Sequence, residues 1–323
     1  MKNILCTGAS GFIGRNFLDQ DFPKDWNITG TYNESVEEEL IQNKNVEYMG
    51  LNLSNSKDVE ECLGGIKWDL ILHLASNTNV RSSIYNPLND LKSTFMSTFN
   101  LVTYCDFKRF VYMSSGAVYN GYKNLVDPDI LNSYGFKSGI PYAINKFMSE
   151  LYIKSVCDGW LKTQENMHKK HYTILRFMGG YGKYENERKF IRKIIKEISF
   201  KDIKTLRLAG SGNNTFQLLY YTDMINAINK VVKHGLKSKE NILVDLCGDI
   251  EDTYTLNSFI KMVQEISEHK IKKIEKIDTL IEDNRFVCDN TQFRNKFNWK
   301  QQYYLLNGLE DYINNVRLNT DGF

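Results

Sequence analysis

Three glycines at intervals of three residues follow the first apolar segment of the chain. The stretch TGASGFIG at 7–14 lies between an apolar run typical of a strand and a segment typical of a helix. Gly8 allows the tight turn out of the strand, Gly11 lets the main chain approach a pyrophosphate, and Gly14 allows close packing of helix on strand. The helix N-terminus would present N–H groups and the positive end of its dipole to the phosphates. The pattern predicts a dinucleotide cradle.

Composition and charge exclude several other classes of protein. The 323 residues carry a formal net charge of +2, with 25% charged residues, so no strong field favours nucleic acid or a membrane as partner. No apolar run is long enough to span a bilayer and no signal-peptide pattern is present, so we expect a cytoplasmic protein. The six cysteines are scattered singly, which predicts reduced thiols, no disulfides and no metal site.

Short β-rich runs alternate with helix-length stretches in the first half of the chain. Apolar residues at helical spacing predict long helices over 91–104 and 142–156. Alternation of this kind is typical of a parallel sheet with helices on both faces, so we predict an α/β fold with a Rossmann-type doubly wound sheet. The predicted strands are 28–32, 46–50, 69–74, 109–113 and 172–177.

The alternation weakens after Phe177, and the chain is long for one compact domain. We expect a dinucleotide-binding domain at 1–177, joined by returning segments near 217–250 and 284–292. The remaining segments of 178–323 would form a smaller, interwoven C-terminal substrate domain. Its region contains an amphipathic helix predicted at 190–198, strands at 218–223 and 242–246, and helices at 256–266 and 305–316.

Tyr142 and Lys146 lie four residues apart in a predicted helix, so their side chains share one face. An ammonium beside a phenol stabilises the phenolate, so we expect the pKa of Tyr142 to fall below its usual value of about 10. The phenol could then exchange a proton with a sugar hydroxyl or carbonyl. Ser114 and Ser115 end the preceding strand, at the edge of an open α/β sheet where ligands bind. The same spacing also occurs by chance on helices without a catalytic role, so the motif alone leaves both interpretations open.

A set of motifs is spread over nearly the whole chain. They are TGASGFIG at 7–14, DLILHLAS at 69–76, NP at 86–87, FVYMSSGAVY at 110–119, YAINK at 142–146, LRFMGGYG at 175–182, NW at 298–299 and GLEDYI at 308–313. Together they resemble the extended short-chain dehydrogenase/reductases, specifically the branch of nucleotide-sugar epimerases, dehydratases and reductases. The resemblance implies an enzyme with bound NAD or NADP, a nucleotide-activated sugar as substrate, and a homodimer formed through the helices at 91–104 and 142–156.

The resemblance also implies roles for single residues. Tyr142 would be the acid/base, Lys146 would hold the nicotinamide ribose and tune Tyr142, and Ser115 would orient the substrate oxygen. The implied cofactor-binding residues are Gly8, Ser10, Gly11, Phe12, Ile13, Gly14, Asn33, Asn52, Leu53, Leu74, Ala75, Ser76, Tyr142, Lys146 and Phe177. The implied substrate-binding residues are Thr78, Ser115, Gly116, Gly179 and Arg285. His73 is expected to be a packed, hydrogen-bonded histidine.

The end of the second predicted strand departs from the NAD-binding pattern. An NAD-binding member would carry Asp or Glu at Tyr32 to bind the adenosine ribose. Its absence removes a charge that would repel the 2′-phosphate of NADP, whereas Glu34 and the acidic run at 37–39 argue for NAD. Asn52 stands where the family usually has Asp beside the adenine. The sequence leaves NAD and NADP both open.

Further departures concern the reaction and the substrate. The resemblance implies that dehydratases of this family carry Thr-Asp-Glu at the positions of Ser115, Gly116 and Ala117. This chain therefore lacks the acid and base that expel water. Phe216 replaces a phosphate-binding arginine of the family, and Arg285 resembles a second one. The leading hypothesis is an NAD(P)-dependent nucleotide-sugar epimerase or 4-keto reductase. The alternatives are a nucleotide-sugar dehydratase and a catalytically inactive dinucleotide-sensing protein.

Overall fold

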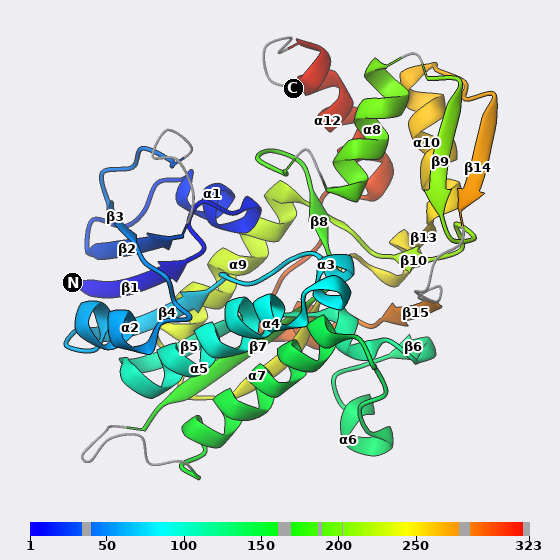
Figure 1. The fold of residues 1–323 in the computed structure, drawn as a ribbon. Helices are drawn as coiled ribbons and strands as arrows, with labels where there is room; N and C mark the ends of the chain where they lie inside the picture. Colours follow the sequence, from blue (N-terminus) through cyan, green and yellow to red (C-terminus); the bar gives the residue numbers. More distant parts are fainter. Residues whose placement is uncertain (34–39, 161–168, 187–188, 202, 278–284, 319–323) are drawn as a thin grey trace. The chain divides into compact units, whose positions relative to one another are not determined.

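The computed structural model describes residues 1–33, 40–160, 169–186, 189–201, 203–277 and 285–318 (Figure 1). The acidic residues at 34 and 37–39 lie outside this described part. The chain forms two compact units. Unit 1 consists of Met1–Val118, Phe136–Phe177 and Ile225–Val244, and unit 2 consists of Tyr119–Gly135, Met178–Met224 and Asp245–Phe323. None of the helices in the described ranges is both long and apolar enough to cross a membrane.

Unit 1 is built around a seven-stranded sheet with the order β12-β7-β5-β4-β1-β2-β3. The pairs β1–β2, β2–β3, β1–β4, β4–β5 and β5–β7 are parallel. Because the strand order reverses beside β1, ligands are expected beyond the carboxyl ends of β1 and β4. The strands are β1 (Lys2–Thr7), β2 (Trp26–Tyr32), β3 (Val46–Gly50), β4 (Lys67–His73), β5 (Asp106–Ser115), β7 (His171–Phe177) and β12 (Ile242–Leu246).

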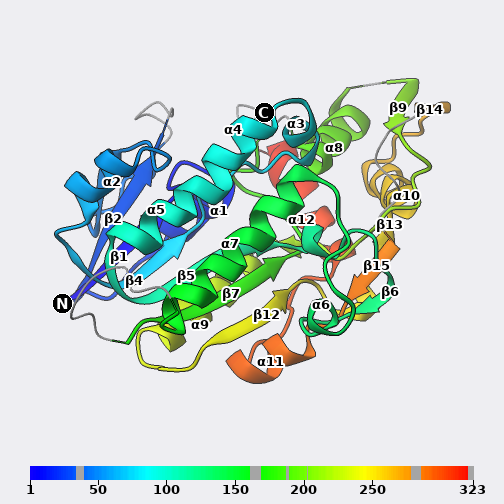
Figure 2. The same cartoon turned by 60° about the horizontal axis from the view of Figure 1, so that its bottom comes forward.

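Helices cover both faces of this sheet (Figures 1 and 2). One face carries α2 (Ser56–Leu63), α5 (Ser97–Tyr104) and α7 (Pro141–Cys157), and the other carries α1 (Phe12–Leu18) and α9 (Tyr221–Gly235). The chain reaches α5 through α3 (Val80–Tyr85), α4 (Pro87–Asp90) and the π-helical turn η2 (Leu91–Met96). Fully buried side chains such as Leu101, Phe110 and Ile153 join the helices to the sheet, and each contributes about 1.5–3 kcal/mol by leaving water.

The predicted α/β, Rossmann-type doubly wound fold is confirmed. The strands predicted at 46–50 and 242–246 coincide with β3 and β12, and the other strands of this sheet agree within a few residues. The prediction of a strand over 218–223 is wrong beyond β11 (Leu219–Tyr220), because α9 begins at Tyr221. Asp223 lies in the first turn of α9, where a carboxylate is favourable, and it accepts the N–H of Tyr303 at 2.7 Å.

Unit 2 contains short paired strands and helices. β15 (Arg285–Cys288) pairs with β6 (Lys123–Val126), β14 (Lys273–Ile277) with β9 (Thr205–Ala209), β11 with β8 (Gly180–Tyr181), and β10 (Thr215–Phe216) with β13 (Tyr254–Thr255). The helices predicted at 190–198, 256–266 and 305–316 are α8 (Phe190–Phe200), α10 (Leu256–Ser267) and α12 (Leu305–Leu318). Its shorter elements are the 3-10 turn η4 (Ile250–Asp252) and the helices α6 (Ile130–Tyr134) and α11 (Thr291–Phe297). The 3-10 turn η3 (Gly116–Tyr119) belongs to unit 1 except for its last residue. The cofactor-binding and substrate-binding roles of the two parts stay predictions.

Candidate active site

The glycine-rich turn connects β1 to α1 in unit 1. Gly8 has φ +71°, in the left-handed region that favours glycine. A Cβ at Gly14 would lie 2.2 Å from the carbonyl oxygen of Gly8, so only glycine lets α1 begin this close to the turn. Gly11 precedes α1 and offers no side chain to its first N–H groups, which can therefore bind an anion. The half-buried side chains of Ser10, Phe12 and Ile13 belong to the same turn.

The Thr7 hydroxyl joins the ends of β1 and β4. It accepts the N–H groups of residues 74–75 at 3.2 Å and lies 2.7 Å from His73 Nδ1. The hydroxyl therefore donates to Nδ1, and Nε2 carries the ring proton and faces Thr98 Oγ1 at 3.0 Å. Burial, with the charge of Lys146, lowers the pKa of His73 to about 3, so the ring is neutral. The prediction of a packed, hydrogen-bonded histidine is confirmed.

The structure brings Ser115, Tyr142 and Lys146 together within unit 1. Ser115 ends β5, and Tyr142 and Lys146 lie near the start of α7, which packs on β5. Ser115 lies close enough to the Tyr142 phenol to lower its pKa, and Ser115 Oγ accepts the N–H of Ala117 at 3.2 Å. Lys146 Nζ donates to the carbonyl oxygen of Met113 at 2.7 Å and lies 5.9 Å from the centroid of the Tyr142 ring. The three groups can therefore act on one bound molecule.

Burial controls the protonation of this cluster. Tyr142 is 8% exposed and Lys146 is 3% exposed. Burial raises the pKa of Tyr142 to about 12, although the neighbouring Ser115 hydroxyl lowers it, and the charge of Asp90 raises it further. Burial lowers the pKa of Lys146 to about 7, against the charges of Asp90 and Glu150. The prediction that the pKa of Tyr142 falls below about 10 is therefore wrong in this structure, because desolvation outweighs the neighbouring ammonium.

A buried ion pair beneath the cluster was not predicted from the sequence. Glu150, two turns beyond Tyr142 on α7, accepts two hydrogen bonds from Arg176 of β7, from Nε at 3.0 Å and from Nη2 at 2.7 Å. Ser114 Oγ donates to the same carboxylate at 2.5 Å. Both charged side chains are almost inaccessible. One sign of this pair is present in the sequence: Arg176 lies inside a predicted strand and Glu150 inside a predicted helix.

Other predicted cofactor residues occupy several loops of unit 1. Asn52 is exposed, and its side-chain oxygen accepts the N–H and the hydroxyl of Ser54, which makes it a turn residue. Leu53 is buried, and its carbonyl oxygen accepts the side-chain amide of Asn100 at 2.9 Å. Ser76 donates to the carbonyl oxygen of residue 77 at 2.8 Å. Asn33 is exposed, and Phe177 is half-buried at the end of β7. Thr78, a predicted substrate-binding residue, is exposed in the loop after β4.

Gly116 is buried in η3 in unit 1, whereas Gly179 and Arg285 belong to unit 2. Gly179 has φ +130°, and a Cβ there would lie 2.9 Å from Leu218 Cδ2, which accounts for glycine at this position. Arg285 is exposed and begins β15. The structure of unit 2 around β15 depends on Gln217, whose Oε1 accepts the N–H of Cys288 at 2.7 Å.

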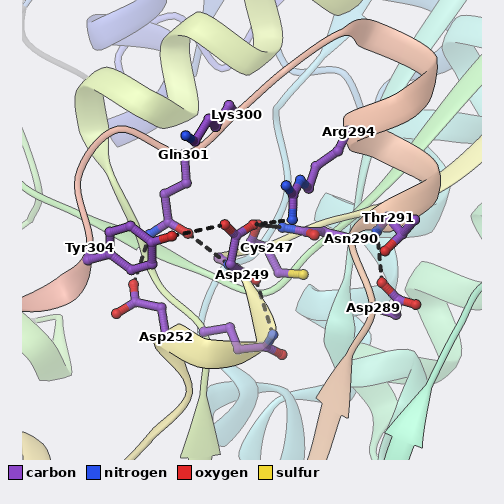
Figure 3. A network of polar contacts seen from close by, with 12 residues as sticks. Cys247, Asp249, Asp252, Asp289, Asn290, Thr291, Arg294, Lys300, Gln301 and Tyr304 are labelled. Carbon is purple, nitrogen blue, oxygen red and sulfur yellow. Dashed lines mark hydrogen bonds and ion pairs between the residues drawn. The ribbon is translucent and has the colours of Figure 1, made fainter.

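A polar network anchors the segment that follows β15 in unit 2 (Figure 3). Asp249 accepts Asn290 Nδ2 at 2.9 Å and forms an ion pair with Arg294 at 3.5 Å. The N–H of Asp249 donates to Gln301 Oε1 at 2.7 Å, and Gln301 Nε2 donates to Asp252 at 2.8 Å. Buried polar groups of this kind are paired, as stability requires. We assign this network to the structure of unit 2 and not to catalysis.

Comparisons with known proteins give the family of the chain. A provisionally named UDP-glucose 4-epimerase of Methanocaldococcus jannaschii is 25% identical over 69% of this chain and 71% of its own length. A dTDP-glucose 4,6-dehydratase of Haemophilus influenzae is 23% identical over 97% of both chains. The solved structure of a UDP-glucuronic acid 4-epimerase from Bacillus cereus, in complex with UDP-glucuronic acid and NAD, has a TM-score of 0.79 at 20% identity and covers 98% of this chain and 99% of its own.

The family model described as "NAD dependent epimerase/dehydratase family" matches residues 4–245, most of the chain and all three residues of the Ser115, Tyr142 and Lys146 cluster. The chain therefore belongs to the NAD-dependent epimerase/dehydratase family of enzymes.

Proposed function

We propose that this protein is an NAD-dependent epimerase that acts at a carbon of a nucleotide-activated sugar, with Tyr142 as its acid/base. The observation that carries the proposal is that Ser115 lies beside the Tyr142 phenol, with Lys146 buried one turn further along α7. The group lies at the carboxyl end of β5, where open α/β sheets bind ligands. Net reduction of a 4-keto sugar uses the same three residues and is the alternative within this reaction class.

The residues of unit 1 fit a dinucleotide. Glycine is required at Gly8 by its φ and at Gly14 by space, and the turn between them would hold the pyrophosphate at the start of α1. Lys146 would hold the nicotinamide ribose, and the residues at 74–76 would line the same edge of the sheet. When bound, the nicotinamide accepts and returns a hydride. The family description and the NAD in the Bacillus cereus enzyme favour NAD over NADP.

The side chains of the cluster supply proton transfer and orientation. Ser115 already accepts the Ala117 N–H, so its own proton is available to the phenol or to a substrate oxygen. Tyr142 would take the proton of a sugar hydroxyl during oxidation and return it during reduction. Positive charge on Lys146 would favour the phenolate form of Tyr142.

The substrate class is supported by the relatives. The names of the two curated relatives include UDP-glucose and dTDP-glucose, and the Bacillus cereus enzyme holds UDP-glucuronic acid. We infer that Thr78, Ser115 and Gly116 contact the sugar. We infer that Gly179 and Arg285 serve the nucleotide part, because a guanidinium suits a diphosphate.

Two other functions are testable with the same protein. A nucleotide-sugar dehydratase is favoured by the Haemophilus influenzae relative, but Gly116 and Ala117 offer no acid or base to expel water. A catalytically inactive dinucleotide sensor would need no Ser115, Tyr142 and Lys146 cluster. Mass spectrometry identifies dehydration, which lowers the product mass by one water, whereas epimerisation leaves the mass unchanged. NMR of the sugar then separates epimerisation, which gives a new isomer, from a sensor, which gives no product.

The first prediction concerns Tyr142→Phe. We expect NAD binding to be retained and kcat to fall by about 10²–10⁴-fold, because proton transfer is lost while the ring still fills its site. Turnover is measured with a panel of UDP-, dTDP- and GDP-sugars. The matched control is Tyr172→Phe at the opposite end of the sheet, at the start of β7, which should leave kcat within about twofold. Wild-type turnover by Tyr142→Phe would exclude Tyr142 as the acid/base.

We also propose that the protein is a homodimer. Helix α7 exposes Ile144, Met148 and Leu151, which are apolar and 36%, 36% and 51% accessible. They form one stripe at helical spacing, on the helix that the family resemblance assigns to the dimer interface. Cytoplasmic location and a role in polysaccharide biosynthesis stay predictions.

A further inference from the structure

A buried carboxylate that the motifs did not include is linked to the helix of Tyr142 and Lys146. Asp90 ends α4 and is 0% exposed. Its Oδ1 accepts Asn77 Nδ2 at 2.6 Å, and its Oδ2 accepts Asn145 Nδ2 at 2.7 Å. Asn77 lies in the loop after β4, and Asn145 directly precedes Lys146 on α7. Asp90 therefore joins the two segments that carry the proposed sugar-binding and proton-transfer groups.

The two amides orient the loop after β4 without neutralising Asp90. Asn77 Oδ1 accepts the N–H of Asn79 at 3.0 Å, so the same side chain that meets Asp90 also folds the loop around Thr78. Both carboxylate oxygens have a donor, which removes the cost of unpaired buried oxygens. The donors are uncharged, so the negative charge of Asp90 still acts on neighbouring ionisable groups.

The charge of Asp90 acts on both members of the proton-transfer pair. It raises the pKa of Lys146 against burial and adds to the raised pKa of Tyr142. The other ionisable groups that face the pair are Glu150 on α7, His73 on β4 and Tyr112 on β5. Glu150 is already paired with Arg176, His73 is neutral, and burial raises the pKa of Tyr112 so that it stays neutral as well. Of the two carboxylates near Lys146, Glu150 accepts hydrogen bonds from the Arg176 guanidinium, whereas the donors to Asp90 in the described part of the chain are the uncharged amides of Asn77 and Asn145.

We propose that Asp90 is a positioning residue of the reaction, which holds the loop at 76–79 against α7 through its hydrogen bonds with Asn77 and Asn145 and so places a negative charge near Lys146. The role in the reaction rests on the proposed function, whereas the electrostatic and structural effects are properties of unit 1 alone. Removal of the Asp90 charge should release protons from Lys146 and Tyr142 at lower pH, because each loses an interaction that favours its protonated form.

The first test follows Lys146 directly and needs no substrate. In full-length protein labelled with 13Cε-lysine, the Lys146 NMR signal is identified by its loss in Lys146→Arg and titrated with pH. In Asp90→Asn the midpoint should move down by about one pH unit, and Asp90→Glu should keep it near the wild-type value. The control Asp25→Asn removes an exposed charge of unit 1 and should move nothing. An unmoved midpoint in Asp90→Asn overturns the electrostatic part of the proposal.

Two further measurements complete the test. Amide hydrogen exchange at 76–79 should be faster in Asp90→Asn, and unchanged exchange would contradict the role in holding the loop. With an active sugar nucleotide, both limbs of the kcat/KM pH profile should move to lower pH, which a purely structural role would not cause. If no substrate is turned over by the wild type, the proposed function fails while the titration still decides the present inference. Asp90→Ser removes the charge with a smaller side chain if the asparagine variant does not fold.

Discussion

Burial of the Lys146 side chain disfavours its protonated, charged form. Its pKa falls from 10.5 to about 7, mainly through desolvation. Between about pH 7 and 10.5 the unfolded chain binds a proton that folded Lys146 does not, so folding releases it and stability rises with pH. Below about pH 7 both states are protonated, and the full penalty of burying the charge is present.

The second prediction is that the difference in unfolding free energy between wild type and Lys146→Met changes with pH. Relative to the variant, the wild type should gain stability from pH 7 to 9, with a slope of at most about 1.4 kcal/mol per pH unit. Urea unfolding at pH 6, 7, 8 and 9 measures it. Lys57→Met, at an exposed position of α2, should show no such slope. A flat difference for Lys146→Met would show that burial does not depress this pKa.

The third prediction concerns Gly14. In Gly14→Ala the new Cβ would meet the Gly8 carbonyl at 2.2 Å, so the turn must shift. We expect a loss of about 1–3 kcal/mol in unfolding free energy and at least tenfold weaker NAD binding. Gly65→Ala is the matched control, because a Cβ at Gly65 has nothing within 4 Å and its backbone is not left-handed. Isothermal titration with NAD and urea unfolding provide the readouts, and equal behaviour of the two variants would contradict the prediction.

Single residues show what the sequence could and could not establish. The spacing of Tyr142 and Lys146 predicted their shared face, because it depends only on helix geometry. Their pKa values could not be predicted, because desolvation depends on how β5, α4 and α7 pack around them. Asp90 was missed for a similar reason: its partners lie 13 and 55 residues away in the chain.

At the scale of elements, the Glu150–Arg176 pair joins α7 to β7. The fourth prediction is that Arg176→Met destabilises the protein by about 3–5 kcal/mol, because it leaves Glu150 buried without its counter-charge. The double variant Glu150→Leu/Arg176→Met should recover part of this loss. In urea unfolding, Lys57→Met breaks the exposed pair with Glu61 and should cost less than about 1 kcal/mol. A cost for Arg176→Met as small as that of Lys57→Met would be inconsistent with the pair's burial.

The elements themselves were predictable where periodicity is simple. The helix over 142–156 follows from apolar spacing and is α7, with Pro141 at its first turn. The helix over 91–104 was predicted as regular, but its first turns are π-helical at Leu91–Met96. The apolar spacing did not reveal this π-helical turn, because a single i→i+5 turn inside a helix changes the positions of the apolar residues only slightly. The start of α9 was missed because Asp223 gains its partners from the distant segment at 302–303.

At the scale of the whole molecule, the sequence predicted a doubly wound parallel sheet but not which segments belong to which unit. β1, β4 and β5 follow local apolar patterns, and parallel pairing with crossover helices leaves few arrangements. Membership of 119–135 in unit 2 depends on the pairing of β6 with β15, about 160 residues away. Such a contact has no local signature. A dimer interface likewise depends on residues that no local motif identifies, so the homodimer needs an experimental test.

The fifth prediction is that Leu151→Arg converts a dimer to a monomer. Leu151 is 51% exposed in the apolar stripe of α7, and two symmetry-related copies would place like charges against each other in an interface from which water is excluded. Sedimentation velocity at micromolar concentration measures the molecular mass. Leu125→Arg, at a leucine of β6 that is 54% exposed in unit 2, should leave the mass of the dimer unchanged. A wild-type protein that sediments at 37.6 kDa would exclude the dimer, and a Leu151→Arg variant that stays dimeric would exclude this face.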